Sequence, residues 1–367
     1  MEVEISPKES RKAYGGEGGE YYAWSAGDLP MLAVAEKGAA KLVLGGRGLA
    51  IPSYSDSAKI AYVLEGSGRA GIVLPEASER VVAIRKGDAI ALPFGAVAWW
   101  FNDSSEADLT VLFLGDTSKA HKRGEFTDFQ LTGASGIFTG FTAEFAGRAF
   151  DLSEQEASRL VRSQPSGGIV KLKEGFQIPE PSEMDREGLV LNCEEAPLDV
   201  DVERGGRVVV VSSQNLPLVG DCGFGGDLVK LNGGAMCSPG FSCDSAFQVT
   251  YITKGSGRVQ VVGIEGKRVL ETAVKAGSLF IVPRFFVVSK IADAGGMQWF
   301  SIVTTPNPVF THLAGKTSVW KALSPQVLKA SFNVSPETEE LFRSKRTSDS
   351  IFFPPPQLTA TPSAETE

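Results

Sequence analysis

Few side chains of this 367-residue chain are of the kinds that commonly bind transition metals. The cysteines and histidines are Cys193, Cys222, Cys237, Cys243, His121 and His312. Cys237 and Cys243 are close enough in sequence to suggest a metal site, but a zinc site usually takes four ligands and neither histidine lies near them. We therefore expect the cysteines to pack as small, buried apolar side chains rather than to hold a metal ion.

Three consecutive aromatic residues, Trp99, Trp100 and Phe101, form a second group that could contact a ligand. Successive side chains of a β-strand point to opposite faces, so a strand here would direct one Trp into the core and the other outward. We favour core filling and contact with a second subunit over stacking on a bound ligand, because large aromatic side chains serve the first two purposes more often.

Length and composition are those of a soluble globular protein with about two domains. The chain is 22% charged and 43% hydrophobic, and its net charge of −8 disfavours binding to nucleic acid or anionic lipid. The first residues, MEVEISPKESRKAYGG, lack the apolar stretch of a secretory signal, and no apolar run approaches the ~20 residues of a membrane span. We therefore expect a cytoplasmic protein with reduced cysteines and no membrane partner.

An internal repeat organises the chain. AYVLEGSGRAGIVL (61–74) matches TYITKGSGRVQVVG (250–263), and Pro93 matches Pro283, 190 residues later. Alternating apolar residues around a Gly-Ser-Gly turn predict a β-hairpin in each half. A repeat of this length implies two similar domains, one after the other.

Each half ends in a short segment with helical signals, 149–164 and 331–346. Ser153 and Ser335 are placed to accept a hydrogen bond from a free backbone N–H at the start of a helix, and Pro336 suits the first helical turn. Many short strands followed by such an arm predict an all-β protein with a sandwich or barrel in each half.

The residues around these strands carry a family resemblance. Gly87, Pro93, Gly95 and Asn102 resemble the second sequence motif of the cupins, and Gly277 and Pro283 repeat part of it. Segments similar to the legumin (11S globulin) seed storage proteins of plants are NLPLVG (215–220), GSGRVQVVG (255–263), AGSLFIVP (276–283) and LAGKTSVWKALSPQVLKASF (313–332). The resemblance implies two tandem cupin (jelly-roll) β-barrels, each followed by a small helical arm.

The domain boundaries follow from the repeat and the resemblance. We expect an N-terminal barrel with its arm at 1–165 and a C-terminal barrel with its arm at 189–353. Residues 166–188, rich in Pro, Gly and charge, are predicted to be a linker, and 354–367 a disordered tail.

The resemblance also locates the positions where cupins hold a metal ion. In this chain they are occupied by Ser53, Ser55, Lys59, Ala98, Gly240, Ser242, Gln248 and Val288. Hydroxyls, an amide, an ammonium group and aliphatic side chains are poor ligands for a transition metal. We therefore expect no metal, no cofactor and no catalytic residues in either barrel, which argues against a metal-dependent cupin enzyme.

Lys59 leaves one alternative open in the N-terminal barrel. Residues two apart on a strand share a face, so Lys59, Ser53 and Ser55 would point inward together and could bind an anionic metabolite without a metal. The simpler interpretation is that Lys59 reaches the barrel mouth or pairs with Asp56 or Glu65.

Departures from the legumins define the remaining expectations. Legumins are cleaved at an Asn-Gly pair, whereas Arg186 and Glu187 precede GLVLNC (188–193) here, and Cys193 has no partner cysteine in the first half. The resemblance therefore suggests an uncleaved, cytosolic relative of the seed storage globulins. We predict a non-enzymatic storage protein, and the arms predict a closed homotrimer, as they do in legumins.

Overall fold

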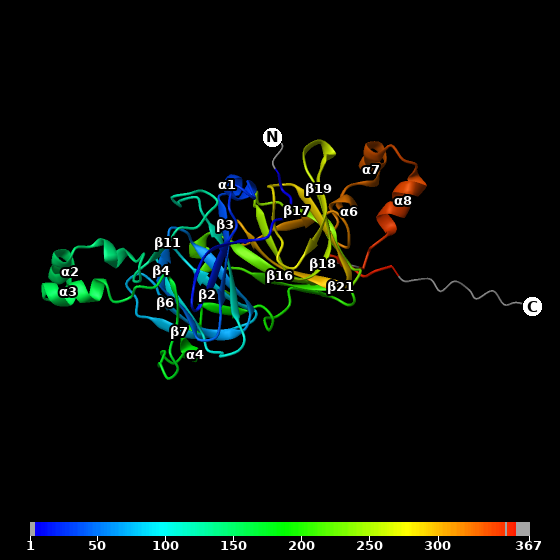
Figure 1. The fold of residues 1–367 in the computed structure, drawn as a ribbon. Helices are drawn as coiled ribbons and strands as arrows, with labels where there is room; N and C mark the ends of the chain where they lie inside the picture. Colours follow the sequence, from blue (N-terminus) through cyan, green and yellow to red (C-terminus); the bar gives the residue numbers. More distant parts are fainter. Residues whose placement is uncertain (1–3, 349–350, 357–367) are drawn as a thin grey trace, which may run out of the picture.

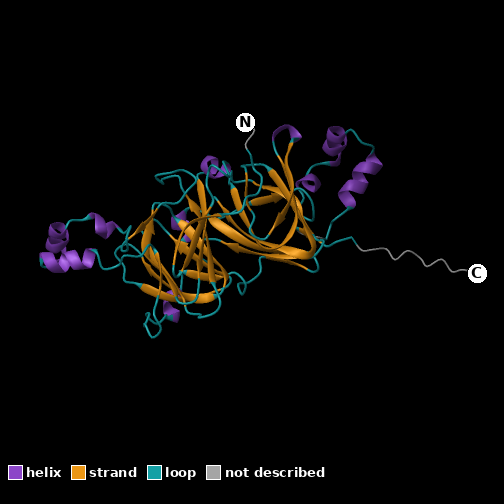
Figure 2. Cartoon of the chain, viewed as in Figure 1, coloured by secondary structure: helices purple, strands orange, loops and turns teal. Residues whose placement is uncertain are grey.

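Both halves of the repeat fold into β-barrels that lie side by side, as predicted (Figure 1). The computed structural model describes residues 4–348 and 351–356, so most of the predicted tail, 357–367, lies outside the described residues. Strands dominate, and the longer helices are gathered into two arms at opposite ends of the molecule (Figure 2). No helix in the described part of the chain is long and apolar enough to cross a membrane.

The N-terminal barrel consists of two sheets. One has the strand order β1-β2-β3-β10-β5-β8-β13, and the other has the order β11-β4-β9-β6-β7, with β12 added beside β4. The strands are β1 Arg11–Gly16, β2 Gly19–Ala23, β3 Lys37–Leu44, β4 Gly48–Ser55, β5 Lys59–Glu65, β6 Ser67–Val73, β7 Arg80–Arg85, β8 Asp88–Leu92, β9 Val97–Asn102, β10 Leu109–Asp116, β11 Asp128–Gln130, β12 Ile169–Lys171 and β13 Val190–Asn192. A short helix, α1 (Met31–Ala35), precedes β3.

The C-terminal barrel repeats this plan with longer, bent strands. Its strands are β14 Val200–Val202, β15 Gly206–Val211, β16 Gly225–Leu231, β17 Met236–Ser242, β18 Gln248–Val262, β19 Arg268–Lys275, β20 Leu279–Val282, β21 Val287–Val303, β22 Phe310–His312 and β23 Phe352–Phe353. The first half of β21 pairs with β17 and its second half with β16, so this strand takes part in both walls of the barrel. A short helix, α5 (Val219–Cys222), precedes β16.

The Gly-Ser-Gly segments do not form hairpins, and that prediction is wrong. β5 pairs with β8 and β10, whereas β6 pairs with β7 and β9. Gly66, at φ 80°, therefore leads the chain from one sheet into the other, and a Cβ there would lie 2.3 Å from the Asp108 carbonyl oxygen. Gly255, at φ 74°, marks the equivalent crossing inside β18. A glycine in an alternating run indicates such a bend as readily as it indicates a hairpin turn.

One hydrophobic cluster extends from the C-terminal barrel across the contact to the facing side of the N-terminal barrel, whose interior forms a second cluster. Tyr62 of the first barrel stacks on Phe300 of the second, with ring centroids 4.2 Å apart, and Trp24 meets Tyr251 edge-on at 5.8 Å. Aromatic pairs in these geometries add to the stabilisation that comes from area burial alone. The barrels are therefore packed as one unit rather than joined only through the chain.

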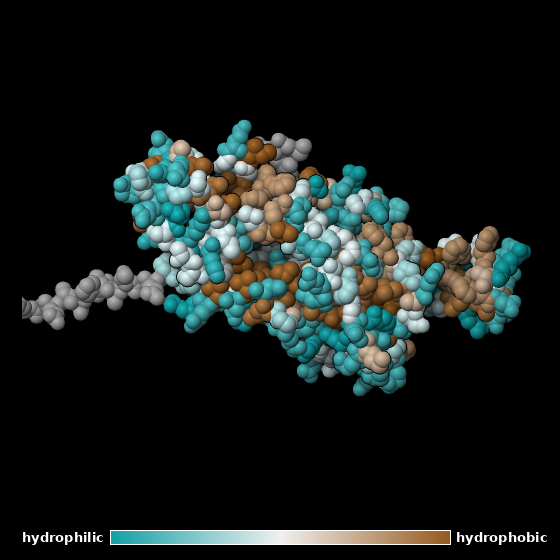
Figure 3. Space-filling view, turned by 180° about the vertical axis from the view of Figure 1, so that it is seen from behind, coloured by the Kyte–Doolittle hydropathy of each residue, from teal (hydrophilic) through white to brown (hydrophobic). Residues whose placement is uncertain are grey.

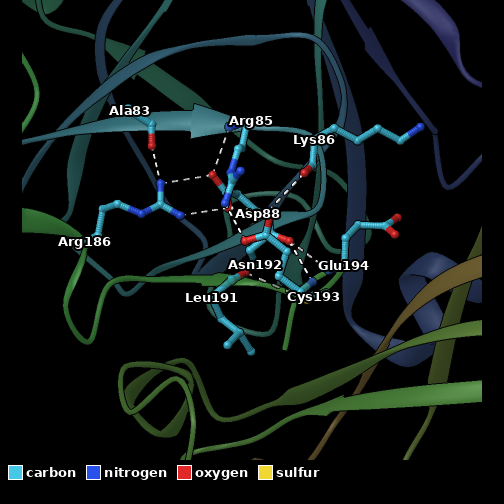
Figure 4. A network of polar contacts seen from close by, with 10 residues as sticks. Ala83, Arg85, Lys86, Asp88, Arg186, Leu191, Asn192, Cys193 and Glu194 are labelled. Atoms are coloured by element: carbon cyan, nitrogen blue, oxygen red, sulfur yellow. Dashed lines mark hydrogen bonds and ion pairs between the residues drawn. The ribbon is translucent and has the colours of Figure 1, made fainter. Parts of the chain in front are cut away.

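The segment between the barrels is held against the N-terminal barrel rather than running free. β12 pairs with β4, and β13 adds a strand beside β8. Next to them lies helix α4 (Glu183–Arg186), whose Arg186 forms an ion pair of 2.9 Å with the fully buried Asp88. Asn192 of β13 also donates to Asp88, at 2.9 Å, so the segment is held through polar contacts as well as strand pairing (Figure 4).

The helical arms form where the N-cap signals predicted them. Helix α3 (Glu154–Val161) begins after Ser153, which makes a full capping box with Glu156, and follows α2 (Ala143–Phe150). In the second arm, α7 (Pro325–Phe332) precedes α8 (Pro336–Ser344), and the Ser335 hydroxyl accepts from the Thr338 N–H. Pro336 occupies the first turn of α8, so these helix starts are confirmed.

Candidate functional site

The predicted lining positions of the N-terminal barrel meet in one cavity. Ser53, Ser55, Lys59 and Ala98 all line it, and Ser53 lies opposite Ala98 in the pairing of β4 with β9. The cavity measures only about 70 Å³. Pockets for small-molecule ligands usually begin near ~300 Å³, so little room is left beside these side chains.

The ammonium group of Lys59 forms an ion pair with a carboxylate of the same barrel. Its side chain is 7% exposed, and its ammonium group lies 2.6 Å from Oδ1 of Asp128 on β11 and 4.3 Å from the ring centre of Phe126. Asp128 also accepts a hydrogen bond of 3.0 Å from the Tyr21 hydroxyl. The partner is thus a carboxylate, as in the simpler interpretation, but it is neither Asp56 nor Glu65. This pairing neutralises the charge that an anionic metabolite would need.

The residues of this cavity do not fit the metal ion that cupin barrels commonly hold. The nearest carboxylate, Asp128, is committed to Lys59, and the remaining predicted positions offer hydroxyls and a methyl group. Among residues 4–348 and 351–356, no group of three or more His, Cys, Asp or Glu side chains is placed to hold a metal ion. The donor set is therefore wrong in kind for a transition metal.

The consecutive tryptophans face opposite sides of β9, as predicted. Trp100 lines the cavity and meets Phe113 edge-on, with ring centroids 5.4 Å apart. Trp99 lies on the other face, packed with Val81 and Phe101, and donates a hydrogen bond of 2.6 Å to Glu79. Both indoles are nearly buried within this chain, which fits the expectation that they fill the core.

The C-terminal barrel has a larger cavity, of about 250 Å³. Ser242, Gln248 and Val288 line it, and the Gln248 amide donates to the Ser242 hydroxyl at 2.9 Å. Gly240 lies on β17, as Ser242 does, and pairs with Val288 of β21 on one side and with His312 of β22 on the other. These predicted positions therefore lie around one cavity. That they correspond to the metal-binding positions of other cupins stays a prediction.

Besides Asp199, whose carboxylate accepts from the Val210 backbone N–H, three ionisable residues that line this cavity were not predicted from the sequence. They are Lys290 on β21, Asp227 on β16 and His312 on β22, and all line the space. A signal for Lys290 was available, because it lies two residues after Val288 and must share its inward face. His312 is far in sequence from the expected lining positions, but β22 pairs with β17 and brings it to the cavity wall.

Burial controls the charge of these three groups. It raises the pKa of the Asp227 carboxyl to about 6, although Lys290 and a hydrogen bond with Ser301 pull it down. Burial also lowers the pKa of His312 to about 4, so its imidazole is neutral at pH 7. The pKa of Lys290 is lowered by burial as well, against the attraction of Cys237 and Asp227.

The cysteines are free thiols with different surroundings. Cys193 and Cys222 are buried and Cys237 is partly buried, as small apolar side chains commonly are. Cys243 is exposed, so the prediction that it is buried is wrong: it follows β17 at the barrel surface, and its thiol donates a hydrogen bond to the Val309 carbonyl. Burial raises the pKa of the Cys237 thiol to about 11, which keeps it protonated at neutral pH.

Comparison with known proteins identifies the family. The chain matches the cupin family over residues 6–158 and 191–340. It is 28% identical to 11S globulin seed storage protein 2 of Sesamum indicum, over 84% of this chain and 82% of that protein. It is 26% identical to glutelin type-A 2 of Oryza sativa subsp. japonica, over 86% and 80%. The crystal structure of the coconut allergen cocosin superimposes with a TM-score of 0.89 at 26% identity, covering 97% of this chain and 99% of that one. The chain therefore belongs to the cupin family, as a legumin-like (11S globulin-type) bicupin of the non-enzymatic storage kind.

Proposed function

We propose that this protein is a nutrient reserve that assembles into a closed homotrimer through its helical arms. The observation that carries the proposal is the exposed apolar surface of both arms, which a monomer would leave in water. The large exposed apolar side chains of the two arms are Phe141, Phe145, Phe150, Leu160, Val327, Phe332, Leu341 and Phe342. Patches of this kind mark interaction surfaces in soluble proteins.

The placement of the arms favours a ring. The arm of α2 and α3 and the arm of α7 and α8 project from opposite ends of the molecule (Figure 1). Figure 3 shows apolar residues exposed on the first arm, at the right of that view. A contact between two different ends of identical chains is heterologous, and it closes into a ring when the rotation between neighbours allows. We propose three subunits for this ring, with no nucleic acid or membrane as partner.

Light scattering at micromolar concentration tests the assembly. We expect a trimer for the wild-type chain and a smaller species for Phe145→Glu, because Phe145 is 67% exposed and a carboxylate there would be buried in the interface. Met184→Glu is the matched control, since Met184 is 85% exposed but lies on α4, away from the arms. A wild-type monomer would refute the trimer, and a trimer of Phe145→Glu would refute the role of this arm.

The absence of enzymatic metal chemistry is proposed from the replaced positions in both barrels. Hydroxyl, amide, methyl and ammonium groups stand where cupin metal ligands are expected, and Lys59 is paired with Asp128. Metal analysis of the purified protein tests this claim. Stoichiometric manganese, iron or zinc bound to the folded chain would overturn it.

We propose further that the protein stays uncleaved and cytoplasmic. Arg186 and Glu187 stand where legumins have their Asn-Gly cleavage pair, and the Arg186–Asp88 ion pair ties that segment to the N-terminal barrel. Extracts of the source tissue should therefore contain the segments before and after Arg186 in one chain under reducing conditions, in the cytosolic fraction. A reserve must also be a major protein of its tissue, so low abundance in every tissue would argue against the storage role.

A further inference from the structure

The cavity of the C-terminal barrel holds a buried cation without a hydrogen-bonding partner. Lys290 is 4% exposed, and its ammonium group lies 4.5 Å from the ring centre of Trp299 and 5.8 Å from that of Phe280. Within the described residues, it forms no hydrogen bond and no ion pair. A ring face attracts an ammonium group but does not accept its N–H groups as a carboxylate does. Lys290 therefore presents unused donors to the cavity that it lines.

Two residues that line the same cavity carry buried polar atoms without partners. Oδ1 of Asp227 and Nδ1 of His312 are buried and have no hydrogen-bond partner among the described residues. Buried polar atoms of native proteins are nearly always bonded, so such atoms at a cavity wall call for an explanation. A bound molecule with donor groups would supply the missing hydrogen bonds.

The remaining walls of the cavity are mostly apolar. They include Val208, Val210, Val229, Val303 and Phe310. An apolar enclosure with a few convergent polar groups is the usual form of a small-molecule site. At about 250 Å³, the cavity lies just below the usual lower limit of ~300 Å³, which restricts it to a small ligand, but it is several times larger than the cavity of the N-terminal barrel, which measures about 70 Å³.

We propose that this cavity binds a small carboxylic acid that has an apolar body and a hydroxyl or ammonium donor beside its carboxylate. The carboxylate would take the donors of Lys290, and the neighbouring donor would serve Asp227 or His312. The apolar body would lie against the valines and Phe310. Each polar group that lacks a partner would then bind a complementary group of the ligand. The proposal does not depend on the storage role or on the trimer.

Four matched probes test the ligand class by isothermal titration calorimetry and thermal shift. They are 3-phenyllactate, phenylalanine, 3-phenylpropanoate, which lacks the donor, and 3-phenylpropan-1-ol, which also lacks the carboxylate. We expect the first two to bind and to raise the melting temperature. Loss of the donor should weaken binding by about tenfold or more, because buried acceptors are then left unpaired, and loss of the carboxylate should abolish it. Failure of all four probes at millimolar concentration would overturn the proposal.

Variants locate the site. Lys290→Met keeps the length of the side chain and removes the unpaired buried charge, so the free variant should melt at a higher temperature than the wild type while its response to 3-phenyllactate disappears. Lys59→Met is the matched control in the other barrel and should keep the wild-type affinity. An unchanged affinity of Lys290→Met would overturn the assignment.

A second variant separates the two ligand classes and keeps the test open if Lys290→Met does not fold. Asp227→Asn preserves shape but removes the negative charge that an ammonium group would meet. We expect it to weaken the binding of phenylalanine by at least about tenfold and that of 3-phenyllactate by less. Equal wild-type affinity of Asp227→Asn for both probes would refute the role of this carboxylate.

Discussion

The contact between Arg186 and Asp88 gives a prediction whose magnitude can be worked out from the structure. The Asp88 side chain is fully buried and that of Arg186 is 19% exposed. The guanidinium donates to Asp88 at 2.9 and 3.2 Å and also to the Ala83 carbonyl (Figure 4). Arg186→Met would therefore leave a buried carboxylate without its counter-charge and a backbone carbonyl without a donor.

We expect Arg186→Met to lower the free energy of unfolding by about 3 kcal/mol. Removing one partner of a buried ion pair commonly costs about 3–5 kcal/mol, because the other charge stays in a poorly solvated place. The lower end applies here since Asp88 keeps two donors at 2.9 Å, the Arg85 backbone N–H and the Asn192 amide.

The neighbouring Arg85 provides a matched control. It forms an ion pair with Glu195 that joins the same two parts of the chain, but the two side chains are 56% and 59% exposed. Exposed pairs contribute at most about 1 kcal/mol, so Arg85→Met should change the unfolding free energy by less than that.

Urea unfolding at pH 7 in reducing buffer measures both variants, and proteolysis between residues 164 and 188 reports opening of the segment. Combining Arg186→Met with Asp88→Asn should recover part of the loss, because the buried charge is removed together with its partner. If Arg186→Met and Arg85→Met differed by less than about 0.5 kcal/mol, the claim that this buried pair holds the segment in place would be refuted.

Three further predictions follow from single positions. Tyr62→Ala removes the ring that stacks on Phe300 between the barrels, and thermal unfolding should show a loss of about 3–5 kcal/mol. Phe285 adopts φ 62° with an exposed side chain, so Phe285→Gly should raise stability by about 1 kcal/mol in the same assay. Burial lowers the pKa of His312 to about 4, against about 6.5 in an unfolded chain. Between these values the unfolded chain binds more protons, so this residue makes stability rise with pH from about 4 to 6.5. Asp227 titrates in the same range, and urea unfolding of His312→Phe beside the wild type isolates the His312 contribution, which the variant should lose.

The internal repeat made the architecture predictable, but not the path of the chain through it. Matching segments at 61–74 and 250–263 require two similar domains whatever the local geometry. The pairing partners of β5 and β6 are set by strands that lie farther along the chain, β8 to β10. A local pattern of alternating residues and glycines contains no information about those partners, and so the hairpin prediction failed.

In the candidate sites, too, the local sequence pattern predicted which side chains share a face but not which distant residues they contact. Alternation on a strand placed Ser53, Ser55 and Lys59 on one inward face, and they do share a cavity. The partner of Lys59 is Asp128, 69 residues away on an edge strand, whereas Asp56 and Glu65 were only its neighbours in sequence. Ion pairs depend on which strands meet in space, and no spacing rule predicts that meeting.

Lys59 and Lys290, the buried lysines that line the two barrel cavities, show that replaced metal positions do not settle what a cupin barrel can bind. Burying an ammonium group is unfavourable unless an anion compensates for the lost hydration. In the N-terminal barrel Asp128 does so at 2.6 Å, and the remaining space is too small for a ligand. In the C-terminal barrel the rings around Lys290 and the attraction of Asp227, which forms no ion pair with it among the described residues, provide only part of that compensation, and the space beside it is larger. Folding alone would favour an apolar residue at position 290, because a methionine would fill the same volume without the charge. The lysine is thus better explained by a ligand than by the stability of the barrel, and the melting temperature of Lys290→Met decides between the two: a value below that of the wild-type protein would show that Lys290 serves the fold.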